Sequence, residues 1–502
     1  MNNYRLLVII SFISGLISLG FEIMAGFILR PVFGSSVFVW GSVIGSILLG
    51  LALGYNIGGR ISESNYSNQI ILAYTLFLLS PIIAASGFFG ADIAPHLTII
   101  NSPVLAPLVP SLMLFGPIAL LFGFVNPIII SIVTGTKGSV SGRIFSFSTF
   151  GSIIGVFLVT FLMIPYVGIF TTTLLSSFIL LIVGVIYSWT IGIEKYKIAL
   201  IFLLMSSALV FGYYLSEDPI KDNLTDSQEI VTSVNSYDKK IYVIDIKLDN
   251  GRVIRGMGFD NFNILQSQVY KDDKDQVEPP YMRMSLLPFL NDNDINKSLV
   301  LGGGGYVGPR AIHNIDNDTK IDVVEKDRRV YEVAKKHMYY TPEEFPRITT
   351  HISDGRQFVR ESNEEYDYIF IDVYDVNSIP HHMTTVEFYN EVKNKLDKNG
   401  YLVVNVGGET PFFEAQYRTI DTVFKDYNIH RYFSQSSSNS IVIVTKSDWN
   451  ESRIRSNSRK TTYRLEELLG DKKEVQISDN VPLLTDNKNP ADILASQMYN
   501  EE

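Results

Sequence analysis

Residues 298–327 read SLVLGGGGYVGPRAIHNIDNDTKIDVVEKD, and their pattern indicates the fold class of the C-terminal half. An apolar strand at 298–301 leads into four consecutive glycines, and a helical stretch at 309–315 leads into a second apolar strand at 321–325. Glycines after a first strand let the backbone approach a ligand closely. The order of strand, glycine loop, helix and strand therefore predicts the start of a doubly wound parallel sheet.

The rest of the C-terminal half extends this pattern. Apolar strands alternate with helical stretches up to residue 446, which predicts a Rossmann-like α/β domain over residues 291–446. Residues 225–290 are β-rich with an Asn250-Gly251 turn, and they predict a small antiparallel β-hairpin domain. Residues 447–502 are expected to form a C-terminal tail that packs on the α/β domain.

The first 215 residues carry few charges. They hold 7 of the 42 basic and 4 of the 52 acidic residues of the chain, a net charge of +3, so the remainder has a net charge of −13. A helix needs about 20 apolar residues to cross a bilayer core. Residues 1–215 are therefore predicted to form a polytopic domain of about seven transmembrane helices, with the lipid bilayer as partner. The apolar runs lie near 5–29, 37–58, 69–91, 106–134, 143–165, 168–191 and 197–215.

The basic residues favour a cytoplasmic N-terminus in the cell membrane. Six of them lie at the N-terminus or in alternate loops, against two on the other side. With seven spans the C-terminal half would lie outside the cell, whereas an eighth or re-entrant segment would return it to the cytoplasm. Both topologies stay open on the sequence.

Polar and small residues interrupt the first two spans. Glu22 lies inside the first one, where it can either form a helix–helix hydrogen bond or take part in ligand binding. Ser46, Gly50, Gly54 and Gly58 recur every four residues in the second one, which favours close helix packing over catalysis.

Acidic residues follow three apolar strands of the α/β domain. Glu325 ends the second strand, Asp354-Gly355 follows the third, and Asp372 and Asp375 follow the fourth. Parallel strands end at one edge of a sheet, so these residues can form an adenosine pocket with an amine beside it. A carboxylate there can take the proton of the amine, which is no nucleophile while it is protonated. Asp354 and Asp375 could instead cap a helix or a turn.

Composition argues against several other functions. The chain has no Cys, which excludes disulfides, thiolate metal sites and Cys nucleophiles. The acidic C-terminal half carries no nucleic-acid motif, so no nucleic-acid partner is expected. The histidines are scattered apart from His381-His382, whose adjacency suits joint ligation poorly, so no metal site is predicted. On a surface loop these two are expected to be neutral bystanders rather than substrate contacts.

The chain resembles a known family. Its glycine loop and the blocks VVEKD, SDGRQF, IFIDVYD and TTVEFYNEVKNKLDKNG resemble the signature blocks of the spermidine/spermine synthases, the polyamine aminopropyltransferases. GFEIMAGFILRPVFGSS and GLALGYNIGGR are similar to the membrane half of the multi-span proteins fused to such a synthase. The resemblance covers nearly the whole chain.

That resemblance implies a reaction and a set of roles. The donor would be decarboxylated S-adenosylmethionine, a small-molecule amine would attack the carbon next to its sulfonium, and methylthioadenosine would leave. Asp372 would be the base, while Asp375 and Tyr281 would help to seat the amine. Soluble relatives imply a possible homodimer. The implied donor-binding residues are Gly302, Gly303, Gly304, Gln266, Glu325, Asp354 and Gly355.

The chain also departs from the family pattern. Gly305 stands where soluble members have the Asp that binds the amino end of the donor, Tyr237-Asp238 replaces a Tyr-Gln pair, and Arg283 replaces an acid near the amine. These changes leave another reaction of S-adenosylmethionine open, either methyl transfer or donor cleavage. A non-catalytic transporter or sensor that binds a nucleoside or polyamine is the third hypothesis.

Overall fold

A computed structural model divides the chain into two compact units, Met1–Leu224 and Thr225–Glu502. The structure describes the following residues: 3–34, 36–99, 105–133, 137–194, 197, 205–206, 224–236, 239–291, 294–316, 318–373, 380–408, 410–435, 437–461, 463, 465–475, 477 and 481–496.

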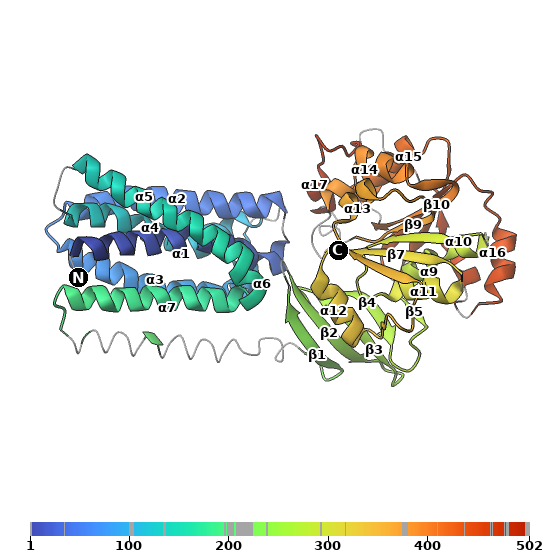
Figure 1. Cartoon of the computed structure of the whole chain (residues 1–502), viewed down its shortest axis with the longest axis horizontal. Coiled ribbons are helices and arrows are strands. Elements are labelled where there is room, and N and C mark those ends of the chain that lie inside the picture. Colours follow the sequence, from blue (N-terminus) through green and yellow to red (C-terminus); the bar gives the residue numbers. More distant parts are fainter. Residues whose placement is uncertain are drawn as a thin grey trace. The chain divides into compact units, whose positions relative to one another are not determined.

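The N-terminal unit is helical (Figure 1). Among its described residues, six helices are long and apolar enough to cross a membrane, and they coincide with the first six predicted spans. The seventh predicted span, 197–215, lies almost entirely outside the described residues. The helices are α1 (Asn3–Phe33), α2 (Val37–Ser62), α3 (Asn68–Ile93), η1 (Ala94–Leu97), α4 (Leu108–Ile132), α5 (Lys137–Leu158), η2 (Val159–Met163), α6 (Ile164–Val167) and α7 (Ile169–Thr190).

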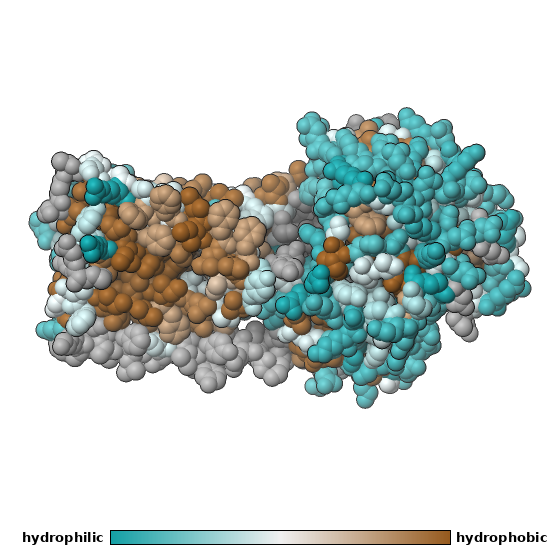
Figure 2. Space-filling model, in the orientation of Figure 1, coloured by the Kyte–Doolittle hydropathy of each residue, from teal (hydrophilic) through white to brown (hydrophobic). Residues whose placement is uncertain are grey.

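The surface of this unit differs from that of the other. On the displayed face it is mostly hydrophobic, whereas the C-terminal unit is mostly hydrophilic (Figure 2). Large apolar side chains such as Leu48, Phe150 and Phe161 are exposed on its helices. An apolar surface of this extent is unusual for a protein in water and fits a lipid environment.

Small residues bring α2 and α4 together, as the four-residue spacing indicates. A Cβ on Gly54 would lie 2.2 Å from the carbonyl oxygen of Leu120, and one on Gly50 would lie 2.6 Å from that of Gly116. The backbones are thus too close for any side chain, which confirms the packing role of these glycines. Glu22 is half-buried in α1 and makes no hydrogen bond with any residue that the structure describes.

The C-terminal unit begins with a five-stranded antiparallel sheet in the order β1-β2-β3-β4-β5. The turn between β2 and β3 contains Gly251, whose φ of +81° favours glycine. The sheet forms within one compact unit together with the α/β sheet. Its strands are β1 (Gln228–Asn235), β2 (Lys240–Lys247), β3 (Val253–Phe259), β4 (Leu265–Tyr270) and β5 (Val277–Glu278).

The second sheet has eight strands in the order β13-β11-β12-β10-β9-β6-β7-β8. Five neighbouring strands run parallel to one another, namely β10, β9, β6, β7 and β8. The other three strands, β12, β11 and β13, continue the sheet beyond β10 with antiparallel pairing. The predicted Rossmann-like sheet is confirmed. The strands are β6 (Lys297–Leu301), β7 (Lys320–Glu325), β8 (Ile348–Ile352), β9 (Tyr366–Ile371), β10 (Leu396–Gly407), β11 (Asn428–Ser434), β12 (Asn439–Thr445) and β13 (Lys472–Lys473).

Helices cover both faces of this sheet. Val300 and Phe370 belong to the apolar cluster on one face, and Leu301 and Ile371 to the cluster on the other, because successive side chains of a strand alternate. Both faces of β6 and β9 are therefore buried, and ligands can reach these strands only at their ends. The helices are α9 (Pro280–Met284), α10 (Leu287–Asn291), α11 (Val307–Ile315), α12 (Arg328–His337), α13 (Gly355–Glu361), η3 (His381–Met383), α14 (Val386–Lys393), α15 (Pro411–Val423), α16 (Glu451–Ser458), η4 (Leu465–Asp471) and α17 (Ala491–Ser496).

Candidate active site

Four neighbouring parallel strands, in the order β9-β6-β7-β8, end at the same edge of the sheet. The glycine loop follows β6, Glu325 ends β7, Asp354 follows β8 by two residues, and Asp372 follows β9 directly. Open α/β sheets bind their ligands at this edge. The structure thus brings the predicted carboxylates of three strands and the glycine loop to one place.

The glycine loop is tightly folded against its neighbours. Gly302 has a φ of +101°, and a Cβ there would lie 2.1 Å from the carbonyl oxygen of Asp372. Gly304 also has a positive φ, +49°. Gly302 must be glycine because of its close approach to the next strand, and the backbone angle of Gly304 favours glycine. The loop therefore lies directly beside the end of β9.

Glu325 organises this loop. Its Oε2 accepts hydrogen bonds from the amides of Gly303 and Gly304, each at 3.1 Å, and its Oε1 accepts one from the amide of Asp327 at 2.9 Å. Burial raises the pKa of Glu325, and these amides lower it. The next amide, that of Gly305, donates to Ser267 Oγ at 2.9 Å. The loop amides are engaged within the protein, which favours a nucleoside over a ligand held by its phosphates.

Asp354 forms the third part of the site. Its Oδ1 accepts from the amides of Arg356 and Gln357, at 3.0 and 3.1 Å, so it caps α13. Its Oδ2 lies 2.9 Å from His382 Nε2. The contact with His382 and the two amides lower the pKa of Asp354 to about 2, against burial, which raises it. The ring of His382, which the sequence predicted to be a bystander, therefore contacts a predicted nucleoside-binding carboxylate.

Asp372 lies at the other end of the site. Its Oδ1 accepts from Asn405 Nδ2 at 2.8 Å, and its carboxylate also accepts from the hydroxyl of Tyr281, which is 8% exposed. Burial raises the pKa of Asp372 to about 6, while the Asn405 and Tyr281 hydrogen bonds lower it. The Asn405 amide is in turn held by Asn439, whose Nδ2 donates to Asn405 Oδ1 at 3.0 Å.

Other predicted residues are placed differently. Gln266 lies on β4 next to Ser267, at the place where the register between β3 and β4 shifts. It takes part in none of the contacts above. Gly355 begins α13 and packs against Met383, since a Cβ on Gly355 would lie 2.7 Å from Met383 Cε. Asp375 lies outside the described residues, as does the pair Tyr237-Asp238.

Sequence reasoning missed three residues that shape the site. Asn405 is a polar residue in the apolar run YLVVNVGG, and that interruption of a buried strand is a usable signal. Ser267 and His382 come from elements whose contacts depend on long-range folding. Among the residues that the structure describes, no three His, Asp or Glu side chains gather to hold a metal ion.

One protein-family model matches the region that contains the candidate active site. Residues 282–445 match the family model described as spermine/spermidine synthase domain. We call residues 282–445, which are similar to this family, the synthase domain. The resemblance of the motifs in this region is thereby confirmed, and the family is one of transferases.

Known relatives match parts of the chain. A polyamine aminopropyltransferase of Vibrio vulnificus is 25% identical over 242 residues, which cover 46% of this chain and 80% of the relative. A polyamine aminopropyltransferase of Saccharolobus solfataricus is 33% identical over 138 residues, which cover 26% of this chain and 45% of the relative. A probable polyamine aminopropyl transferase of Bifidobacterium longum is covered over 50% of its length.

Solved structures of similar proteins include spermidine synthases. One, in complex with the transition state analogue AdoDATO, is 23% identical with a TM-score of 0.39, over 49% of this chain and 84% of that chain. The spermidine synthase from Thermotoga maritima has the same values.

Proposed function

We propose that the chain is a membrane-anchored aminopropyltransferase. It would transfer an aminopropyl group from decarboxylated S-adenosylmethionine to an amine and release methylthioadenosine. The observation that carries this proposal is Asp372, a half-buried residue whose backbone carbonyl lies against Gly302 of the glycine loop. Its carboxylate has a pKa near 6 and is held by Tyr281 and Asn405. The synthase domain and the names of the relatives support the same reaction.

The proposed reaction uses Asp372 as the base. The amine nitrogen attacks the carbon next to the sulfonium, the carbon–sulfur bond breaks, and its electron pair stays on the sulfur of methylthioadenosine. Asp372 takes a proton from the ammonium group before this attack and so frees the lone pair of the nitrogen. A pKa near 6 leaves this group mostly ionised at neutral pH and makes it a stronger base than an exposed carboxylate. The donor supplies the leaving group, so the protein mainly aligns the nitrogen, carbon and sulfur.

The donor would lie across the ends of β6, β7 and β8. Glu325 would accept the ribose hydroxyls, because a carboxylate that already holds three amides retains lone pairs for further donors. Asp354 would accept the adenine amino group. Its Oδ1 is engaged by backbone amides, so Oδ2, which also contacts His382 Nε2 at 2.9 Å, would be the oxygen that accepts from the ligand.

A second reaction is favoured by the surroundings of Gly305. A Cβ on this residue would lie 2.7 Å from Ser267 Cβ, so the protein has neither a carboxylate nor room for one at this place. A donor that relies on such a carboxylate for its amino end would bind weakly. S-adenosylmethionine itself, used for methyl transfer or cleaved, is therefore the alternative donor.

Product analysis separates these reactions. Purified full-length protein is incubated with each donor, with and without a panel of diamines and polyamines, and nucleoside products are identified by mass spectrometry. Methylthioadenosine that forms only with amine supports the transfer. Adenosylhomocysteine would indicate methyl transfer, and methylthioadenosine without amine would indicate donor cleavage; either result would replace the proposal.

The membrane anchor is part of the proposal and rests on the six apolar helices. If it is correct, the protein stays in the membrane pellet after an alkaline carbonate wash and is released only by detergent. Recovery in the carbonate supernatant would contradict it.

A further inference from the structure

A segment near the end of the chain packs against the synthase domain and is hydrogen-bonded to it. We call residues 481–491 the C-terminal strap. The buried Leu484 fixes its centre: its amide donates to Thr419 Oγ1 at 3.1 Å, and its carbonyl accepts from the amide of Val386 at 2.8 Å. The strap therefore joins α15 to the start of α14.

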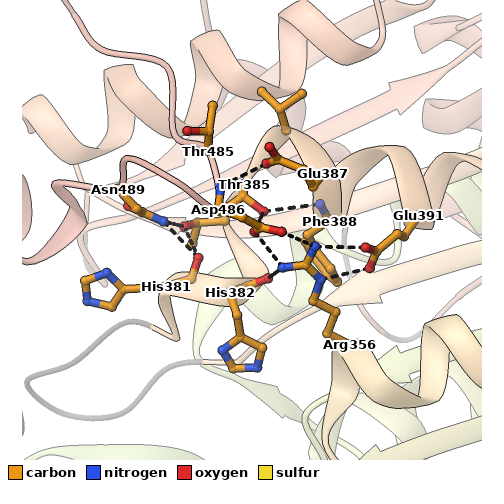
Figure 3. Close-up of polar contacts among 12 residues, drawn as sticks. Arg356, His381, His382, Thr385, Glu387, Phe388, Glu391, Thr485, Asp486 and Asn489 are labelled. Carbon is orange, nitrogen blue, oxygen red and sulfur yellow. Dashed lines mark hydrogen bonds and ion pairs between the residues drawn. The ribbon is translucent and has the colours of Figure 1, made fainter.

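Arg356 of α13 connects the strap to the active site (Figure 3). Its side chain is 5% exposed, and all five of its N–H groups are used. Two donate to Glu391 of α14 at 2.8 Å each, two to Asp486 of the strap at 2.7 Å each, and one to the carbonyl of His382 at 2.9 Å. A fork of this kind fixes the direction of each partner.

The same loop is tied to the strap a second time. Asn489 donates through Nδ2 to the carbonyl of His381 at 2.8 Å and to Thr384 Oγ1 at 3.0 Å. Thr385, which caps α14, donates to Asp486 Oδ1 at 2.7 Å. Residues 381–385 are thus held from both sides, and the ring of His382 is directed onto Asp354 Oδ2.

Asp486 completes a cluster of two arginines and two carboxylates. Glu391 is shared between the buried guanidinium of Arg356, through two hydrogen bonds, and Arg360, at 2.8 Å. Asp486, from a segment 130 residues away, supplies the second negative charge and at the same time fixes the position of the strap. Arg356, which Asp486 holds, also donates to the carbonyl of His382, the one histidine that contacts Asp354 among the described residues. This arrangement indicates that His382 is the residue being positioned.

We propose that His382 is a nucleoside-site residue that shares Asp354 Oδ2 with the adenine amino group, and that Asp486 positions it through Arg356. The inference rests on the nucleoside pocket of the proposed function. It adds a determinant of nucleoside specificity that depends on the strap. His382 restricts the direction from which the amino group of a nucleoside base can donate to Asp354 Oδ2. Loss of the strap contact would release the ring and weaken nucleoside binding without touching Asp372.

The test measures the affinity of full-length protein in detergent for methylthioadenosine, by calorimetry. Asp486→Ala and His382→Ala are each expected to weaken binding about tenfold, the size of one charged hydrogen bond. The double variant should bind no more weakly than the worse single variant, because both changes remove one arrangement. Lys488→Ala is the matched control, since Lys488 is exposed on the same strap and its side chain makes no hydrogen bond or ion pair with described residues. Asp486→Asn, which keeps the size of the side chain, replaces Asp486→Ala if the latter does not fold.

Steady-state kinetics supply a readout that a purely structural role would not give. We expect the donor KM to rise in both single variants while kcat stays within about twofold of the wild type. Wild-type affinity in His382→Ala and in the Asp486 variant, or strictly additive losses in the double variant, would overturn the inference and leave the proposed function standing. A wild-type protein that binds no methylthioadenosine would overturn both.

Discussion

Replacement of Asp372 by Asn should remove activity and stabilise the protein at the same time. Asn has the shape of Asp, and its Oδ1 can still accept from Asn405 Nδ2. The variant cannot take a proton from the amine, so we expect turnover to fall by about 10²–10⁴-fold. Affinity for methylthioadenosine should stay close to that of the wild type, because Asp354 and Glu325 are unchanged.

The gain in stability follows from the raised pKa. Burial shifts the pKa of Asp372 from 3.8 to about 6. The unfolded chain therefore loses this proton first, and stability falls as the pH rises between these two values. Each pKa unit corresponds to about 1.4 kcal/mol, so the ionised carboxylate costs roughly 3 kcal/mol above pH 6, and less because Asp372 keeps part of its surface exposed. We expect Asn to recover about 1–3 kcal/mol at pH 7.5.

Hydrogen exchange at the amides of β9 and β10 measures this gain locally. Exchange in Asp372→Asn should slow by about 5- to 100-fold at pH 7.5, and the difference should vanish near pH 4. Asp421→Asn, on the exposed face of α15, is the control and should change neither exchange nor turnover. Wild-type turnover in Asp372→Asn would refute the role of the base. Faster exchange together with lost turnover would mean that the carboxylate holds the fold rather than the chemistry.

Four further outcomes are expected. The kcat/KM of the wild type should rise through one ionisation near pH 6, and Asn405→Ala should move that midpoint upward by about one unit, because the amide lowers the pKa of the base; an unchanged pH profile would separate the two residues. Gly305→Ala should weaken methylthioadenosine binding about tenfold, since the new Cβ would meet Ser267 at 2.7 Å, and a Ser267→Gly change should restore binding; no rescue would contradict the steric reason. Glu325→Gln should weaken methylthioadenosine binding in calorimetry by about 10- to 100-fold; equal affinity would place the ribose elsewhere. A reporter fused after Glu502 should be active in the cytoplasm, where S-adenosyl donors are available, and an external signal would contradict the enzyme proposal.

The strand ends of the synthase domain can be predicted because each is marked locally. An apolar run followed by glycines or by an acid indicates where a buried strand stops, and parallel strands stop at one edge. These local signals are enough to place Glu325, Asp354 and Asp372 together from the amino-acid sequence alone. The helices of the first half are equally predictable, since about 20 apolar residues have few alternatives to a membrane span.

The contacts that orient these residues could not be predicted. Asn405 contacts Asp372 because β10 pairs with β9 in a register that sets Val404 opposite Ile371. The register between two strands that are distant in the sequence cannot be derived from the residues of either strand alone. His382 and Asp354 are 28 residues apart, and Asp486 and Arg356 are 130 apart. Such pairs depend on how whole elements pack, so the strap and the contact of His382 are visible only in the folded chain.

In the proposed reaction, one pocket at this sheet edge holds a nucleoside sulfonium beside an amine that Asp372 deprotonates. The decisive experiment is mass spectrometry of the amine after incubation with decarboxylated S-adenosylmethionine. We predict an amine extended by one aminopropyl group, formed in equal amount with methylthioadenosine by the wild type and absent with Asp372→Asn. An unextended amine in the presence of bound donor, or equal yields from both proteins, would rule out this reaction at Asp372.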